Sequence, residues 1–245
     1  MAKLRSPLLE KIFPSRYRRV LVRMTRWPPV GKVDFHDLRR LEPISRSWGG
    51  DRGMQIDRYY IESFLQNHMY EIRGHILEFG GNLYTQKFGA GQVVKSDVLH
   101  VVDGNPQATI VADLSNAPQI PDDIFDCIVC TQTLQFIPDV EDAVRTLHRI
   151  LKPGGVILAT ASTISQLDLG KEWDDHWRFT SYGFNRLFNR EFKSENVNVT
   201  AYGNVLTATA FLQGLAVEEL RSDELEYSDP AYEMVVVARV IKEAE

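Results

Sequence analysis

The clearest pattern of apolar and polar positions lies between residues 140 and 151, where apolar side chains recur every three or four positions. They are Val140, Val144, Leu147, Ile150 and Leu151. This spacing places them on one face of a helix. Asp139 stands where an N-cap belongs, and Lys152-Pro153-Gly154-Gly155 ends the pattern. The same spacing predicts a helix over 56–72, and a further helix is expected over 205–220.

Short apolar segments alternate with these helices. They span residues 75–79, 98–103, 109–114, 125–134, 156–162, 196–202 and 232–241. Strands that alternate with helices predict an α/β fold with a Rossmann-like, mostly parallel seven-stranded sheet and helices on both faces. The last two strands are expected to form an antiparallel edge. We assign residues 56–245 to this domain and residues 1–55 to a basic N-terminal extension that includes a cofactor-capping segment.

Ligands of such sheets bind outside the carboxyl ends of the strands, so the residues at these ends are candidates for a site. The first strand ends in Glu78-Phe79-Gly80-Gly81, where glycine permits close approach to the backbone. Asp103 follows the second strand, 23 residues after Gly80, a separation at which an acid can bind ribose hydroxyls. Asp113-Leu114 follows the third strand and Gln132 the fourth.

This ordered series resembles the class I S-adenosylmethionine-dependent methyltransferase family. The resemblance covers about residues 55–165 and is most specific in FDCIVCTQTLQFIPDVEDAVRTLHRILKPGGVILAT. More loosely, PISRSWGGDRGMQIDRYYIESFL and DHWRFTSYG look like bacterial methyltransferases associated with glycan and secondary-metabolite biosynthesis. The later glycines of the family pattern E-x-G-x-G-x-G are replaced here by Asn82 and Tyr84.

The resemblance implies S-adenosylmethionine as cofactor and a role for each matching residue. Gly80 and Gly81 would lie beside its methionine part, Asp103 would hold the ribose, and Asp113 with Leu114 the adenine. Gln132 would lie near the sulfonium, while Tyr59 and Arg58, with Tyr60 and Arg52, would cap the cofactor. Glu78, at the end of the first strand, is likewise expected to bind the cofactor. Three of these residues have a structural alternative: Glu78 as a cap of backbone amides, Asp103 as a turn residue and Asp113 as a helix or turn cap.

A polar and aromatic cluster, Trp173-Asp174-Asp175-His176-Trp177-Arg178, follows the fifth strand. A histidine beside carboxylates can act as a general base, so we predict His176 as the catalytic base and Asp175 as the next candidate. The tryptophans would stack on a sugar or another flat acceptor. The alternative is a loop held in place by its aromatic rings, with Arg178 paired to Asp174 or Asp175.

The two cysteines, Cys127 and Cys130, suggest no metal site, because residues three apart on a strand point to opposite faces. Lys and Arg outnumber Asp and Glu by eight in residues 1–40, whereas the whole chain carries −5, so the remainder carries −13. A basic arm of this kind can contact an anionic membrane surface, although a solvated or docked arm is the alternative. Nucleic acid is disfavoured as a partner because the body is acidic.

The sequence therefore predicts an S-adenosylmethionine-dependent O-methyltransferase acting on a hydroxyl of a sugar, glycolipid or small metabolite. N- or C-methylation of a small metabolite, a non-catalytic scaffold, and a nucleic-acid methyltransferase are the alternatives. No secretory signal is evident, so we expect a cytoplasmic protein, peripheral at the inner face of the membrane if the arm binds lipid. The sequence does not predict an oligomeric state.

Overall fold

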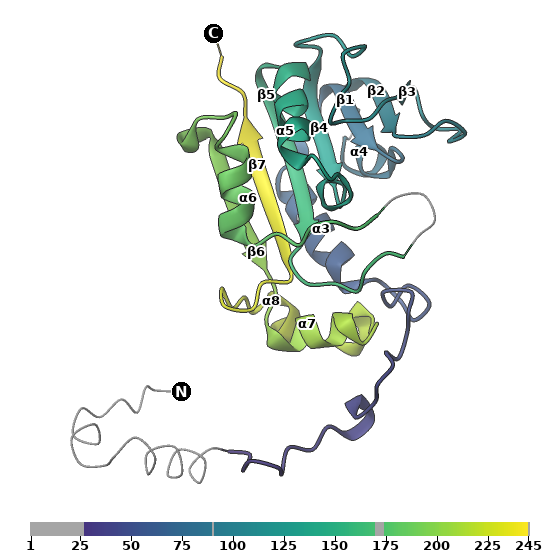
Figure 1. Ribbon diagram of the computed structural model, residues 1–245, viewed down its shortest axis with the longest axis vertical. Coiled ribbons are helices and arrows are strands. Elements are labelled where there is room, and N and C mark those ends of the chain that lie inside the picture. Colours follow the sequence, from purple (N-terminus) through teal and green to yellow (C-terminus); the bar gives the residue numbers. More distant parts are fainter. Residues whose placement is uncertain (1–26, 90, 170–173, 245) are drawn as a thin grey trace, which may run out of the picture. The chain divides into compact units, whose positions relative to one another are not determined.

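The computed structural model describes residues 27–89, 91–169 and 174–244 (Figure 1). The chain divides into two compact units, one ending at Glu42 and the other spanning Pro43–Glu245. Residues 43–55, which the sequence assigned to the extension, thus belong to the unit that contains the sheet. Residues 1–26 of the basic arm lie outside the described residues.

Seven strands form one sheet in the order β3-β2-β1-β4-β5-β7-β6. Their bounds are β1 Gly74–Phe79, β2 Val93–His100, β3 Ile110–Val111, β4 Phe125–Thr131, β5 Leu151–Ser162, β6 Val197–Tyr202 and β7 Val235–Ile241. β1 to β5 pair in parallel, and β7 runs antiparallel to both β5 and β6. The predicted fold class is confirmed, with the antiparallel pairing at the expected edge and β6 as the outermost strand.

Helices cover both faces of the sheet (Figure 1). One face packs against α5 (Val140–Ile150) and α6 (Ser181–Phe188). The other packs against α3 (Ile56–Asn67), α4 (Leu83–Phe88) and α7 (Val205–Leu212). The remaining short elements are α8 Ser222–Glu226 and the 3-10 helices η1 His36–Leu38, η2 Met69–Glu71, η3 Leu134–Phe136, η4 Ser194–Asn196 and η5 Val217–Glu219.

The central strand β4 shows why the sheet is stable. It is buried on both faces, and its side chains alternate between the two apolar cores. Cys127 lies in the core beneath α3, whereas Cys130 lies in the core beneath α5, so the predicted placement on opposite faces is confirmed. Burial raises the pKa of both thiols, that of Cys130 to about 12.

A buried charge cluster lies within β2, away from the carboxyl ends of the strands. Asp97 is 6% exposed and accepts hydrogen bonds from Lys95 Nζ at 2.7 Å and Thr109 Oγ1 at 2.9 Å. Its Oδ2 also lies 2.6 Å from His75 Nε2. Burial by itself raises the pKa of Asp97, but these hydrogen bonds and the Lys95 charge outweigh it and lower the pKa below its ordinary value.

Several predicted elements differ in extent from the structure. β4 ends at Thr131, β5 begins at Leu151 and β7 at Val235, and the helices predicted over 56–72 and 205–220 end at Asn67 and Leu212. β2 begins at Val93 and ends at His100, so residues 101–103 form a bend beyond the strand. β3 contains only Ile110 and Val111. Within the described part of the chain, none of the helices has the length and apolar character needed to cross a membrane.

Candidate functional site

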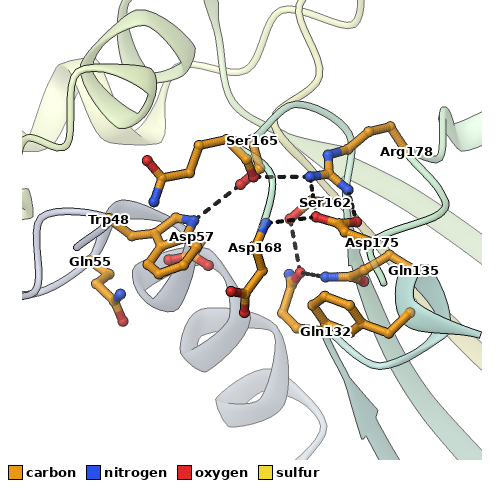
Figure 2. A pocket seen from close by; sticks show the side chains of 12 residues that line it. Trp48, Gln55, Asp57, Gln132, Gln135, Ser162, Ser165, Asp168, Asp175 and Arg178 are labelled. Atoms are coloured by element: carbon orange, nitrogen blue, oxygen red, sulfur yellow. Dashed lines mark hydrogen bonds and ion pairs between the residues drawn. The ribbon is translucent and has the colours of Figure 1, made fainter. Parts of the chain in front are cut away.

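Two cavities adjoin at the carboxyl ends of the strands and share Gln132 and Phe136. The larger, about 420 Å³, lies beyond the ends of β1 to β4, and we call it the apolar cavity. Its apolar walls include Phe79, Leu99, Val101, Val102, Ala112, Leu114, Phe136, Ile137 and Pro138. The smaller, about 260 Å³, is the polar cavity, because all its lining residues except Trp48 and Phe136 are polar (Figure 2). It is also lined by Gln55, Asp57, Gln132, Gln135, Ser162, Ser165, Gln166, Asp168, Asp175 and Arg178.

Gly80 enters the apolar cavity at the end of β1. Its φ of +73° is in the left-handed region that favours glycine, and a Cβ built there would meet nothing within 4 Å. The backbone at this position is therefore open to a ligand. Gly81 lies beside it, but a Cβ there would come within 2.9 Å of the Gln107 side chain.

The buried carboxylate of Glu78 stabilises the turn between β1 and α4. It is 3% exposed, and its two carboxylate oxygens accept the backbone N–H groups of Tyr84 at 3.0 Å and Thr85 at 2.7 Å. Burial raises the pKa of Glu78 despite these hydrogen bonds. The structure thus gives Glu78 the alternative role, that of a cap for the start of α4, which leaves those two N–H donors unavailable to a ligand.

Asp103 does not line the apolar cavity. β2 ends three residues earlier, and the Asp103 carboxylate accepts the N–H of Gly104 in an exposed turn. Gly80 N–H donates to the carbonyl of Leu99 at 3.0 Å, and His100, the last residue of β2, lines the cavity. The structure thus places Asp103 in an exposed turn beyond the end of β2 and outside the cavity lining, as the turn alternative implies.

Asp113 and Leu114 both line the apolar cavity, as the resemblance implies. Leu114 is buried in the core, whereas Asp113 is exposed, and its Oδ1 accepts hydrogen bonds from the N–H and hydroxyl of Ser115. These bonds orient the carboxylate at the rim of the cavity.

Gln132 lies between the two cavities in a strained conformation, with a φ of +49°. Its Oε1 accepts hydrogen bonds from Gln135 Nε2 at 2.7 Å and from the Ser162 hydroxyl at 2.9 Å (Figure 2). Two buried atoms of this network, Gln132 Nε2 and Gln135 Oε1, have no protein partner. Unpaired buried polar atoms at a strained position are typical of a ligand site.

The predicted capping residues Tyr59 and Arg58 line neither cavity. The Arg58 guanidinium lies over the ring of Tyr84, 5.9 Å from its centroid, and the ring of Tyr59 packs edge-on against Tyr60 at 5.4 Å. Gln55 and Asp57, just before them in the chain, line the polar cavity. Asp57 is also the first acidic residue of α3. Sequence reasoning missed it, although it directly precedes the Arg-Tyr-Tyr motif that was noticed.

The loop after β5 divides between the cavities. Asp175 lines the polar cavity, whereas Asp174 and His176 line the apolar one. The Asp175 carboxylate is 5% exposed and binds both terminal nitrogens of Arg178, and it also accepts the N–H of Asp168 at 3.1 Å. Burial by itself raises its pKa, but the Arg178 hydrogen bonds and charge lower it overall, which makes Asp175 a weak base.

Trp177 serves as an anchor for this loop. Its Nε1 donates to the carbonyl of Ile137 at 2.9 Å, and its ring stacks on Phe179, with centroids 6.4 Å apart. It lines neither cavity, so the structural alternative for this tryptophan fits better than an acceptor platform. Trp173, the other predicted platform, lies outside the described residues.

A family model described as a methyltransferase domain matches residues 84–159. A probable methyltransferase of Aspergillus luteorubrus, ltbC, is 40% identical over 67 residues, which cover 24% of this chain and 23% of that protein. The ubiquinone/menaquinone biosynthesis C-methyltransferase UbiE of Pectobacterium carotovorum subsp. carotovorum (strain PC1) is 43% identical over 44 residues, 18% of each chain. The chain thus spans less than a quarter of the length of these curated relatives.

Solved structures show the same fold. A SAM dependent methyltransferase from Archaeoglobus fulgidus superposes with a TM-score of 0.52 at 10% identity, covering 76% of this chain and 94% of that one. The cyclase SpnF gives 0.51 at 12% identity, covering 79% and 84%. Together with the strand order, these findings show that the chain has the fold of S-adenosylmethionine-dependent methyltransferases and that residues 84–159 match a methyltransferase domain.

The apolar cavity fits the nucleoside of this cofactor. Its apolar walls suit the flat adenine ring, and the Asp113 carboxylate at the rim can accept a hydrogen bond from the amino group of that ring. The open backbone at Gly80 leaves room for the methionine part of the cofactor. Among the residues that the structure places at the end of β2, none carries a carboxylate directed into the cavity, and His100 takes that position. In the described chain, no group of three His, Cys, Asp or Glu side chains could hold a metal ion.

Proposed function

We propose that this protein is a methyltransferase that binds S-adenosylmethionine in the apolar cavity and methylates a hydroxyl of a sugar, glycolipid or small metabolite. The observation that supports this most strongly is the convergence of Gly80, Asp113 and Leu114 on one apolar cavity at the carboxyl ends of the strands. Gly80 follows β1 and Asp113-Leu114 follows β3, so the sheet brings together residues that are more than 30 positions apart in the sequence.

When bound, the cofactor would supply a methyl group on a cationic sulfur; the acceptor oxygen bonds to that methyl carbon and releases its proton to water, while the sulfur keeps the electron pair of the broken carbon–sulfur bond. The protein would orient the cofactor and the acceptor and would exclude water from the reacting atoms. Leu114 and Phe136 would pack against the nucleoside, and Asp113 would accept a hydrogen bond from its amino group. Gln132, held by Gln135 and Ser162, would face the junction at which the acceptor meets the cofactor.

Positioning is the larger part of the proposed catalysis, because alignment of two reactants can supply about 7–11 kcal/mol of the barrier. The strained, doubly hydrogen-bonded Gln132 suits this task, since its side chain is fixed before a ligand arrives. A cytoplasmic place of action, and contact between the basic arm and an anionic membrane, remain proposals.

The test is calorimetric titration with S-adenosylhomocysteine, the product form of the cofactor. We expect the wild-type protein to bind it and Asp113→Ala to weaken binding by about 1–3 kcal/mol, the cost of an unpaired buried donor. Asp142→Ala, on the exposed side of α5, is the matched control and should bind as the wild type does. Absence of binding by the wild-type protein would refute the proposed function.

A further inference from the structure

The polar cavity draws its lining from segments that the apolar cavity does not use. Trp48, Gln55 and Asp57 come from the start of α3 and the segment before it, and they face Gln132 and Gln135 across the cavity (Figure 2). Neither Gly80 nor Asp113, the residues proposed to hold the cofactor, lines it. The two cavities meet at Gln132, so a molecule in the polar cavity would lie beside one in the apolar cavity.

The unpaired atoms of the polar cavity require a ligand that both donates and accepts hydrogen bonds. Gln135 is 5% exposed, and its Oε1 is a buried acceptor without a protein partner. Gln132 Nε2 is a buried donor without one. A hydroxyl group satisfies both requirements, and neighbouring hydroxyls can satisfy them together with the carboxylate of Asp57.

The charges of the polar cavity select against anions. Three carboxylates line it, those of Asp57, Asp168 and Asp175, against the single guanidinium of Arg178, which Asp175 already neutralises. A phosphate or carboxylate group would therefore be repelled, whereas a neutral or cationic group would not.

The size and shape of the polar cavity further limit which ligands it can hold. A cavity of about 260 Å³ lies just below the usual range of roughly 300–1,000 Å³ for small-molecule sites, which suits one ring of an acceptor. The indole of Trp48 forms an aromatic wall and is held by its Nε1, which donates to the Ser165 hydroxyl at 3.3 Å. An aromatic wall beside amide and carboxylate groups suits a sugar ring, which has apolar faces and a polar edge.

We propose that the polar cavity is the methyl-acceptor site and that it takes a neutral or cationic polyhydroxylated ring, such as a hexose or an amino sugar. This inference rests on the proposed function and gives it a substrate class. Asp57 and Gln135 bind the acceptor's hydroxyl groups, and Asp57 is the charged residue that selects against phosphorylated sugars.

Thiol protection tests this assignment without relying on turnover. Cys127 and Cys130 are fully buried, so an introduced cysteine on the cavity wall is the thiol that a methanethiosulfonate reagent reaches first. Ser165→Cys reports on the polar cavity and Thr133→Cys on the apolar one. A ligand at about ten times its Kd slows modification of a thiol that it covers about tenfold.

We expect S-adenosylhomocysteine to protect Thr133→Cys and to leave Ser165→Cys reactive. With that ligand present, methyl hexopyranosides or amino sugars should protect Ser165→Cys, and hexose phosphates should not. Protection of both thiols by S-adenosylhomocysteine would show that the polar cavity holds cofactor, which would overturn the assignment. Protection by hexose phosphates, or by none of the sugars, would overturn the substrate class.

Asp57→Asn provides the matching variant. We expect it to lose the sugar protection of Ser165→Cys while the calorimetric Kd for S-adenosylhomocysteine stays unchanged. Glu62→Gln, on the same helix and paired with Lys87, is the control and should alter neither. A weaker S-adenosylhomocysteine Kd in Asp57→Asn would place Asp57 at the cofactor instead. Absence of S-adenosylhomocysteine binding by the wild-type protein is a separate result, since it refutes the proposed function itself.

Discussion

Replacing Glu78 tests whether this residue stabilises the turn between β1 and α4 or binds the cofactor directly. The carboxylate is 3% exposed and holds the backbone N–H groups of Tyr84 and Thr85. Hydrogen bonds to a charged acceptor contribute about 1.5–3 kcal/mol each, and burial of the charge, which raises the pKa of Glu78, offsets part of that sum. The net contribution to stability is therefore a few kcal/mol.

We expect Glu78→Gln to lower the free energy of unfolding by about 2 kcal/mol, because the amide oxygen keeps one N–H partner while its NH₂ group faces the other. Glu78→Ala leaves both donors unpaired and should cost about 3–4 kcal/mol. In urea, with a slope of about 2 kcal/mol per molar, the midpoint of Glu78→Gln should fall by about 1 M with the slope unchanged.

The control is Glu62→Gln, which breaks the partly exposed pair with Lys87 and should change stability by less than about 1 kcal/mol. S-adenosylhomocysteine binding is measured on the same samples, below the unfolding transition. If Glu78→Gln keeps the wild-type midpoint yet loses binding, Glu78 contacts the cofactor itself and the capping argument is wrong.

Three further outcomes follow from the contacts described above. His176→Ala should raise the Kd for S-adenosylhomocysteine more than it lowers kcat, because the ring lines the apolar cavity; a fall in kcat of about 10²–10⁴-fold with Kd unchanged would instead identify a general base. The pKa of Asp97 is lowered in the folded state, so its charge contributes stability that is present above the unfolded pKa of about 3.9 and is lost as the pH falls below that value. Asp97→Asn should therefore flatten the acid side of a plot of unfolding free energy against pH. An unchanged acid side would show that Asp97 does not contribute to the loss of stability in acid. Asp175→Asn should cost about 3–5 kcal/mol by leaving Arg178 unpaired, and a double-mutant cycle with Arg178→Met should show strong coupling; independent effects in that cycle would contradict the ion pair as the stabilising contact.

The sequence predicted those elements whose pattern is set by local periodicity and burial. α5 begins and ends within one residue of the prediction, because its apolar face is strongly one-sided. α4 and α6 were missed. α4 has six residues, and its start is held by the distant Glu78 rather than by a local cap, while α6 begins at the short-range cap Thr180 within a segment noticed for its chemistry. The contact between Glu78 and α4 joins residues on different elements, so it does not appear in the apolar periodicity of the α4 sequence.

The site was predictable in part for the same reason. Gly80, Asp113, Leu114 and Gln132 follow directly from where strands end, and the structure places all four at the apolar cavity. Asp103 does not lie at the end of a strand as predicted. The valines before it suit a strand, but Val101 and Val102 are exposed and β2 ends at His100. The polar cavity was missed because its residues are distant in sequence and meet only in the fold.

The two cavities differ in how their walls are held, and this difference bears on what the domain can methylate. The apolar cavity is built largely on strand ends, whose positions the hydrogen bonding of the parallel sheet fixes. Much of the wall of the polar cavity comes from residues 46–57, 162–168 and 175–178. Side-chain contacts tie the first two of these segments together: Trp48 donates to Ser165, and Gln166 Nε2 donates to the carbonyl of Arg46 at 2.7 Å. Changes in these segments alter the acceptor wall without moving a strand, so acceptor choice can vary while the cofactor cavity stays fixed. Relatives that share the strand-end residues but differ at the equivalents of Trp48, Asp57 and Gln135 should therefore bind the same cofactor and methylate different molecules.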